Sequence, residues 1–316
     1  MLDRVRLFAR LASARNVLLA GAGGGYDIFS GLPLYFRLRA AGKTVHLGNL
    51  SFTQLQGVEG RRLAPAVLEV TADTKGPASY FPEKYLCDWF RSRGEEIAIQ
   101  CFKLHGVRGL TQAYGAVVDA YDIDAVVLVD GGTDSLMRGD EDDLGTPEED
   151  IASICAVHQL AVAQRYLVCV GFGIDSFHGV SHGLVLENVA ALMKAGAFLG
   201  AFSLLPDHEE TTHFREATQH VFDAMPESPS IVSSSILSAA SGEFGDYHAT
   251  HRTAGSTLWI NPLMSMYWAF ELSGVADRCL YLDHVRPTGS YHEVIQAINR
   301  FRASLQAIRA PQPIPH

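Results

Sequence analysis

Paired cysteines and long apolar runs are both missing from this 316-residue sequence. No two of its five cysteines stand in a Cys-x-x-Cys spacing, and an odd number of scattered thiols argues against a disulfide framework or a structural zinc site. No uncharged apolar stretch reaches about 18 residues, the length of a membrane-spanning helix. Charges are spread through the N-terminal segment, unlike a secretory signal. We therefore expect a cytoplasmic protein without a membrane partner.

Positive charge is also scarce. The chain has 25 Lys and Arg against 35 Asp and Glu, a formal net charge of −10, and it has no run rich in Lys or Arg. Because the phosphate backbone would be repelled, we expect no nucleic-acid partner. Neither the G-x-x-x-x-G-K-[ST] pattern of P-loop NTPases nor the G-x-S-x-G elbow of serine hydrolases occurs, so those two classes lose their main support.

Short apolar runs alternate with longer amphipathic segments along the chain. Hydrophobic residues make up 47% of the sequence, which is enough for a sizeable core. Runs that are typical of buried parallel strands occupy residues 16–20, 44–49, 96–102, 125–129 and 166–170. Segments with the apolar spacing of helices lie between them. This alternation predicts an α/β fold, in which a mostly parallel sheet has helices on both faces in a Rossmann-like arrangement.

The sequence has no internal repeat and no linker, which predicts a single α/β domain over residues 1–309. Residues 59–82 are a candidate lid, and residues 310–316 are expected to form a flexible tail. Acidic residues that follow Thr146 and Pro147 are typical of a helix N-terminus, and the pattern predicts a helix over residues 148–165. Residues 278–282 are predicted to form a short strand.

A glycine-rich loop follows the first predicted strand. In open parallel sheets, ligands bind beyond the carboxyl ends of the strands, where this loop is expected to lie. Backbone N–H groups without a neighbouring Cβ approach phosphate closely, so the loop is a candidate phosphate or nucleotide cradle. The alternative is a tight strand-to-helix turn with no ligand, since the loop does not match G-x-G-x-x-G. The candidate residues are Gly21, Gly23, Gly24, Gly25 and Asp27.

Two aspartates follow the most apolar strand, residues 125–129. Asp130 ends that strand and Asp134 comes shortly after it. A carboxylate contributes nothing to an apolar core there, but it is well placed to hold a divalent metal or a sugar hydroxyl. Several oxygen ligands suit Mg²⁺, Mn²⁺ or Ca²⁺, and we favour Mg²⁺ or Mn²⁺. The acidic run at residues 140–143 is interpreted instead as a solvated turn.

An acid and two histidines follow the strand at residues 166–170. Asp175, His178 and His182 are separated by glycines and would supply general acid and base groups. The alternative is structural, with both histidines bonded to loop carbonyls. Further along, Arg252 in the segment 248–253 is a candidate anion anchor, and a purely structural role is equally compatible with the sequence there.

Three separated motifs together resemble an uncharacterised bacterial and archaeal family, known mainly as a domain of unknown function. They are GAGGGYD at residues 21–27, DGGTDS at 130–135 with GDE and LGTPEED following, and GFGID at 171–175. The resemblance spans roughly residues 16–200. It implies an α/β fold like that of nucleotide-binding proteins and carries no activity with it.

A second set of residues is similar to the NAD-binding opening of sirtuins. It consists of GAG at residues 21–23, SGLP at 30–33 and Phe36-Arg37, together with His105-Gly106, which resembles the catalytic His-Gly step of that family. The spacings differ from those of sirtuins, and the zinc-binding cysteine pairs of the family are missing. This resemblance implies NAD or an ADP-ribose-like ligand, with His105 near the nicotinamide ribose.

Three functional hypotheses follow. The first is a hydrolase or group transferase that acts on a nucleotide-like or phosphorylated small molecule. The second is a sirtuin-like protein that binds or consumes NAD. The third is a non-catalytic module that senses a nucleotide. A homodimer is expected because symmetric dimers are the commonest oligomers.

Overall fold

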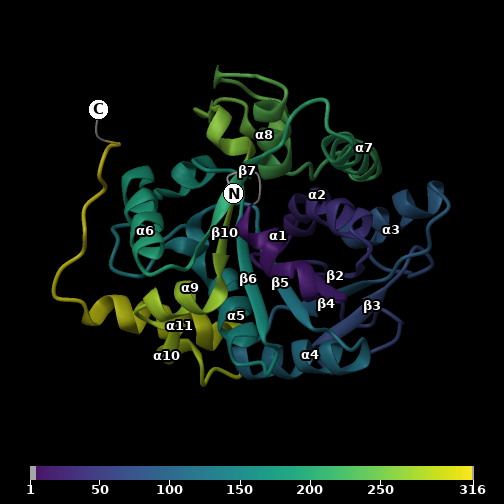
Figure 1. The fold of residues 1–316 in the computed structure, drawn as a ribbon, viewed down its shortest axis with the longest axis horizontal. Coiled ribbons are helices and arrows are strands. Elements are labelled where there is room, and N and C mark those ends of the chain that lie inside the picture. The colour runs from purple at the N-terminus through teal and green to yellow at the C-terminus, as the bar shows by residue number, and fades with distance from the viewer. Residues whose placement is uncertain (1–4, 315–316) are drawn as a thin grey trace.

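The computed structural model describes residues 5–314, and within them eight strands form one sheet in the order β3-β4-β2-β1-β5-β6-β10-β7 (Figure 1). Strands β4, β2, β1, β5 and β6 run parallel, and β3 and β10 are antiparallel to their neighbours. The expected mostly parallel α/β fold is therefore confirmed. The strands are β1 (Asn16–Gly21), β2 (Thr44–Ser51), β3 (Val67–Val70), β4 (Ile99–Lys103), β5 (Ala125–Asp130), β6 (Gln164–Cys169), β7 (Phe198–Ser203) and β10 (Met266–Glu271).

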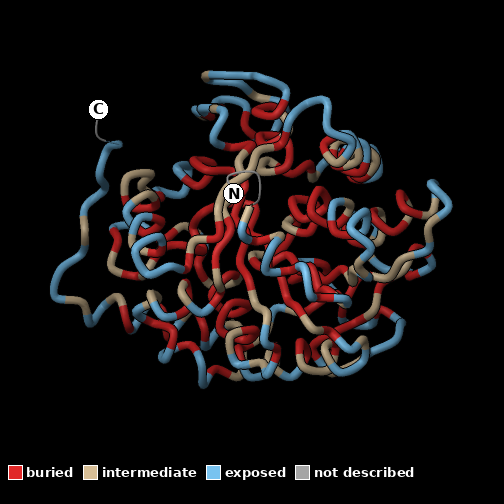
Figure 2. The backbone as a smooth tube through the Cα atoms, in the orientation of Figure 1, coloured by how far each residue is buried: buried red, intermediate tan, exposed pale blue. Residues whose placement is uncertain are grey.

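Helices cover both faces of this sheet because successive strand residues point to opposite sides. In β1, Val17 and Leu19 pack with α1, α2, α3 and α7, whereas Leu18 and Ala20 belong to the core under α4, α5, α6 and α9–α11. Figure 2 shows the resulting buried strands between the two helical layers. The helices are α1 (Arg6–Arg10), α2 (Asp27–Ala40), α3 (Pro82–Ser92), α4 (Val107–Ala120), α5 (Pro147–His158), α6 (His182–Lys194), α7 (Glu209–Ala224), α8 (Ile231–Ala240), α9 (Leu272–Arg278), α10 (Leu282–Val285) and α11 (Tyr291–Ser304).

The order of the parallel strands reverses between β1 and β5. From β1 the chain continues outward to β2 and β4, and it then returns to place β5 and β6 on the other side of β1. The loops after β1 and β5 consequently part at this point, which is where open α/β sheets bind their ligands. In Figure 1, α8 lies at the end of the molecule opposite α10 and α11.

The helix predicted over residues 148–165 is wrong at its C-terminal end. Helix α5 ends at His158, and residues 164–169 form β6. No glycine or proline marks the end of α5, and its last carbonyls are bonded by a side chain from the following strand. The Arg165 guanidinium reaches back from β6 and donates to the carbonyls of His158 (2.5 Å) and Leu160 (2.9 Å). These bonds satisfy carbonyls at the end of the helix.

The strand predicted over residues 278–282 is also wrong. Helix α9 ends at Arg278 and α10 begins at Leu282, and the backbone bonds of the link between them are turn-like, apart from the bond from the Leu280 N–H to the Arg138 carbonyl (2.8 Å). The link packs against α11: the ring centres of Tyr281 and Phe301 lie 5.6 Å apart. Residues 59–82, the candidate lid, supply β3 to the edge of the sheet.

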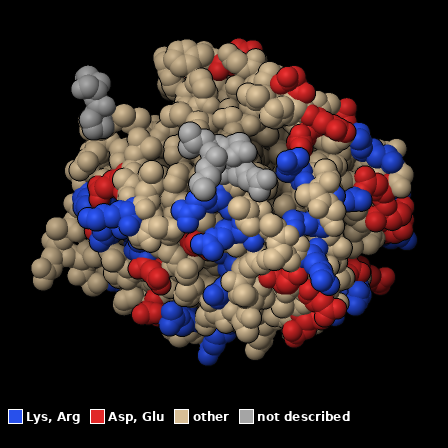
Figure 3. All heavy atoms as spheres, in the orientation of Figure 1, with Lys and Arg blue, Asp and Glu red and all other residues tan. Residues whose placement is uncertain are grey.

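Acidic and basic side chains are interspersed on the face drawn in Figure 3. Among residues 5–314, none of the helices combines the length and the apolar character that a membrane span requires.

The described part of the C-terminal segment, up to residue 314, lies against the loop before α5 and against α6. Arg309 is its anchor: the guanidinium contacts Glu141 at 2.7 Å, Asp140 at 2.9 Å and Glu187 at 2.7 Å. Glu141 is only 1% exposed, and it also accepts a bond from Asn188 (3.0 Å). A buried carboxylate therefore ties this segment to the body of the domain.

Removing this anchor should destabilise the domain. Arg309→Gln leaves the Glu141 carboxylate buried without its cation, so we expect the free energy of unfolding to fall by about 2 kcal/mol. Urea denaturation monitored by circular dichroism measures this change. Arg300→Gln is the matched control, since Arg300 is exposed and makes no salt bridge within residues 5–314. Equal stability of the two variants would contradict the assignment of Arg309 as an anchor.

Candidate functional site

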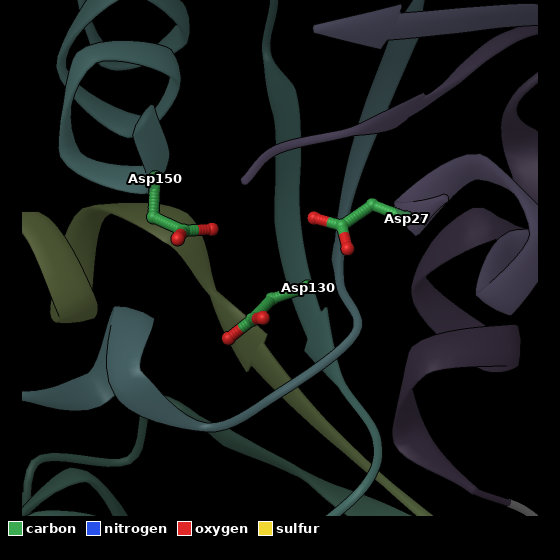
Figure 4. A group of neighbouring side chains, drawn as sticks. All are labelled: Asp27, Asp130 and Asp150. Carbon is green, nitrogen blue, oxygen red and sulfur yellow. The ribbon is translucent and has the colours of Figure 1, made fainter. Parts of the chain in front are cut away.

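Three aspartates meet where β1 and β5 part. Asp27 begins α2 after the glycine loop, Asp130 ends β5, and Asp150 lies in the first turn of α5. One carboxylate oxygen from each lies within 4.8 Å of the others. Figure 4 shows the three side chains pointing toward one another from three different elements. We refer to these residues as the aspartate cluster.

Glycines make this close approach possible. A Cβ at Gly23 would lie 2.7 Å from Asp150 Oδ2 and 3.0 Å from Asp27 Oδ2. A Cβ at Gly131 would lie 2.7 Å from Asp27 Oδ1. Both distances to the nearer oxygen are shorter than real Cβ contacts, so any side chain at either position would push a carboxylate away. The glycines of the first two motifs thus give carboxylates access to the backbone.

Asp27 joins the two loops that part at this point. Its Oδ2 accepts a bond from the Gly23 N–H (2.7 Å), and its Oδ1 accepts one from the Gly131 N–H (3.2 Å). Asp130 is held separately, by a bond from the Ser135 hydroxyl to its Oδ2 (2.5 Å). Two of the three carboxylates therefore have fixed positions before any ligand arrives.

Asp134 and Asp175 are buried beside the aspartate cluster without belonging to it. Asp134 accepts a bond from the Thr146 N–H (2.9 Å), and Asp175 accepts one from the Thr133 N–H (2.7 Å). Of the sequence-predicted metal pair, Asp130 lies in the cluster, whereas Asp134 is engaged by the backbone that leads into α5. Four buried aspartates and the half-buried Asp27 thus lie in one region.

Asp150 differs from the other four because its carboxylate lacks a donor. The side-chain atom Oδ1 is fully buried and accepts no hydrogen bond from residues 5–314. Sequence reasoning missed this residue, since an acidic first turn also suits the helix dipole. A signal existed: Asp150 directly precedes seven uncharged residues, 151–157, a run that predicts a buried helix segment. An unpaired buried oxygen aimed at two carboxylates indicates a missing cation or proton.

Burial dominates the electrostatics of this region. It raises the pKa of Asp27 to about 8, against the opposing effect of the bonds from Gly23 and Gly131. Burial also raises the pKa of Asp130 and Asp150 far above the usual range, and their negative neighbours raise both further. Like charges crowded in a poorly solvated place favour uptake of protons or of a cation.

A cavity of about 830 Å³ adjoins the aspartate cluster. Asp27 belongs to the aspartate cluster and also lines the cavity, whereas Asp130 and Asp150 are buried behind it and do not line the cavity. We call the part of the cavity next to Asp27 its inner end. Asp175, His178 and Glu149 also line the cavity. The remaining walls come from the glycine loop, from the rings of Tyr26, Phe52, Tyr80 and Phe177, and from residues of the segment 227–258.

The glycine loop is only partly open to this cavity. Gly23, Gly24 and Gly25 line it, but the Phe52 ring packs over Gly24, where a Cβ would lie 2.4 Å from the ring. Gly24 and Gly25 both have positive φ values, of 94° and 59°. Gly21 lies outside the lining, and its missing side chain makes room for Asn49, whose amide bonds to the Gly25 carbonyl (2.9 Å).

The structure separates the three candidate histidines. His178 is exposed and lines the cavity. His182 begins α6 and packs on Phe172, with ring centres 5.3 Å apart, and burial lowers its pKa. His105 lies between β4 and α4, next to Gly109, and like His182 it is not among the residues that line the cavity. Only His178 is placed beside the other candidate groups.

Comparison with protein families shows the family of this chain. The model of a protein of unknown function (DUF1152) matches residues 18–304. The chain belongs to this family. The match to DUF1152 runs from β1 to the end of α11, so it includes all five aspartates and the residues that line the cavity. Neither a curated protein nor a solved structure matches the chain.

Replacing Asp150 should stabilise this DUF1152 protein in the absence of metal. Asp150→Asn removes a buried charge, and its amide would donate toward the neighbouring carboxylates. At pH 8 in EDTA, we expect the free energy of unfolding to rise by about 1–2 kcal/mol. Thermal and urea unfolding measure the change, with the exposed Asp119→Asn as the control. A loss of stability would show that the Asp150 carboxylate has favourable partners in the native state.

Proposed function

We propose that this protein is a Mg²⁺- or Mn²⁺-dependent hydrolase or group transferase that acts on a nucleotide-like, phosphorylated small molecule. The observation that carries the proposal is the aspartate cluster, with its unpaired Asp150 oxygen, at the inner end of a large cavity. Its position at the strand-order reversal agrees with the general location of ligands in such sheets.

The chemistry of the donors favours a hard divalent cation. All three groups are carboxylates, which suit Mg²⁺, Mn²⁺ or Ca²⁺ rather than the softer metals that select Cys and His. One oxygen from each carboxylate lies within 4.8 Å of the other two, so the three carboxylates are close enough together to be candidate ligands of one divalent ion.

Asp27 links the cation site to the cavity. A cation held there would neutralise the carboxylates and would polarise a phosphoryl oxygen that enters the cavity. Asp175 and His178 line the same cavity and are the candidates for general acid and base. Asp134 would have a positioning role, because its carboxylate accepts a bond from the Thr146 N–H, directly before α5 begins.

The cavity matches a nucleotide-sized ligand. Its volume of about 830 Å³ lies in the range of sites that enclose small molecules and cofactors. Aromatic rings line part of it, among them those of Phe52, Tyr80 and Phe177. Such rings suit a planar base, whereas the carboxylates and hydroxyls suit a ribose or a metal-bound phosphate. The expected cytoplasmic location and homodimer remain predictions.

Metal binding should stabilise the wild-type protein and leave Asp150→Asn unchanged. A ligand specific for the native state adds about 2.7 kcal/mol at 100 times its Kd, which is visible as a thermal shift. We therefore expect Mn²⁺ or Mg²⁺ to raise the Tm of the wild type relative to EDTA, and to raise that of Asp119→Asn equally. Turnover of a panel of nucleotides and sugar phosphates should need the metal and should fall at least about 100-fold in Asp150→Asn.

Two other outcomes would replace this proposal. A shift with NAD or ADP-ribose that EDTA does not affect would favour an NAD-binding or NAD-consuming protein. A metal-dependent shift with a nucleotide but no product by mass spectrometry would favour a sensing module. A wild-type Tm that neither Mn²⁺ nor Mg²⁺ changes would contradict the cation site.

A further inference from the structure

One wall of the cavity comes from a part of the chain outside the strand-helix units. We call residues 227–258 the cap segment; it includes α8 and the strand β8 (Gly245–Asp246), which pairs with β9 (Trp259–Ile260). The cap segment lines the cavity with the hydroxyls of Ser230, Thr253, Ser256 and Thr257, with Arg252, and with the Glu227 carboxylate. Three further lining carboxylates, those of Asp27, Glu149 and Asp175, come from outside the cap segment.

Arg252 has an uncommon position for an arginine in so acidic a chain. Among residues 5–314, it is the only Lys or Arg in the lining of this cavity. No carboxylate of the described residues lies within 4.0 Å of its guanidinium, whereas eight other arginines of residues 5–314 form ion pairs with Asp or Glu. Its one hydrogen bond to the described residues goes from Nη1 to the Pro229 carbonyl (2.9 Å). Arg252 is exposed, so its other N–H groups are accessible to a ligand.

The turn that carries Arg252 is held by its neighbours. The buried Thr253 hydroxyl lies 2.8 Å from His248 Nδ1, and the Ser256 hydroxyl donates to the Thr253 carbonyl (2.8 Å). His248 in turn lies 3.2 Å from Asp246. Arg252 is consequently presented from an ordered turn, and its positive charge acts on Tyr26, where it opposes the burial that raises the pKa of that phenol.

We propose that Arg252 binds the phosphate group of the substrate and that the substrate is a nucleoside or sugar phosphate monoester. This inference rests on the proposed function and adds the residue that orients the substrate. Carboxylates line the cavity from several segments, and Arg252 is the one Lys or Arg of residues 5–314 among them, so an anionic group is attracted to Arg252 and to a cation held by the aspartate cluster. A guanidinium also matches phosphate geometry through paired N–H donors.

Binding measurements on AMP, ribose 5-phosphate and adenosine test the role of Arg252. Isothermal titration calorimetry of the wild type, Arg252→Gln, Arg252→Lys and Arg215→Gln would be run in EDTA and in Mn²⁺. Arg215 is the matched control, because it lies on α7 and bonds to Ser241 outside this cavity. We expect Arg252→Gln to lower the affinity for AMP and for ribose 5-phosphate by about 10-fold to 100-fold. Arg252→Lys should have an intermediate affinity, and Arg215→Gln should bind both phosphates as the wild type does. Adenosine should bind Arg252→Gln and the wild type equally.

The proposal is overturned if Arg252→Gln binds both phosphates within about twofold of the wild type, or if the wild type binds neither phosphate at millimolar concentration. Titration with Mn²⁺ in the absence of phosphate distinguishes failure of the Arg252 proposal from failure of the proposed cation site. Arg252→Gln should keep the wild-type Mn²⁺ affinity, since Arg252 is not among the cluster ligands. Weak phosphate binding by Arg252→Gln together with no Mn²⁺ binding by the wild type would support the role of Arg252 and contradict the cation site.

Discussion

Burial of negative charge is the constraint on which the site depends. An ionised carboxylate removed from water costs several kcal/mol unless donors, a proton or a cation offset that cost. Asp27, which is half-buried, and three of the four buried aspartates meet this demand with hydrogen bonds from the N–H groups of Gly23, Gly131, Thr133 or Thr146, or from the Ser135 hydroxyl. Asp150 has no such donor within residues 5–314, so it requires a partner that the other side chains do not supply.

The glycine motifs serve the same constraint, because they let carboxylates lie close to the backbone. In the sequence they resemble a phosphate cradle, but the Gly23 N–H is already used by Asp27. Gly131 and Gly132 similarly leave room for carboxylates, since a Cβ at Gly132 would lie 2.8 Å from Asp175. The glycine loop and the cap segment both line the cavity, so carboxylates and Arg252 border a shared space.

Sequence reasoning was sufficient for the fold class and for the edge of the sheet where polar side chains gather. The apolar runs of β1 and β5 predicted that Asp27 and Asp130 would lie at the carboxyl edge of the sheet. Asp150 was not predicted, because its approach to them depends on how α5 packs across the sheet, and a contact between distant segments leaves no local pattern. The end of α5 was also missed, although Arg165, which bonds to the His158 carbonyl, is only seven residues away.

The central claim is that Asp27, Asp130 and Asp150 hold one divalent cation. Anomalous X-ray diffraction from a crystal grown with Mn²⁺ tests it most directly, because the signal locates the ion independently of activity. The account predicts one strong anomalous peak about 2.1–2.4 Å from an oxygen of each carboxylate. A fully ordered aspartate cluster without a peak there, at a Mn²⁺ concentration that saturates exposed sites elsewhere, would contradict it.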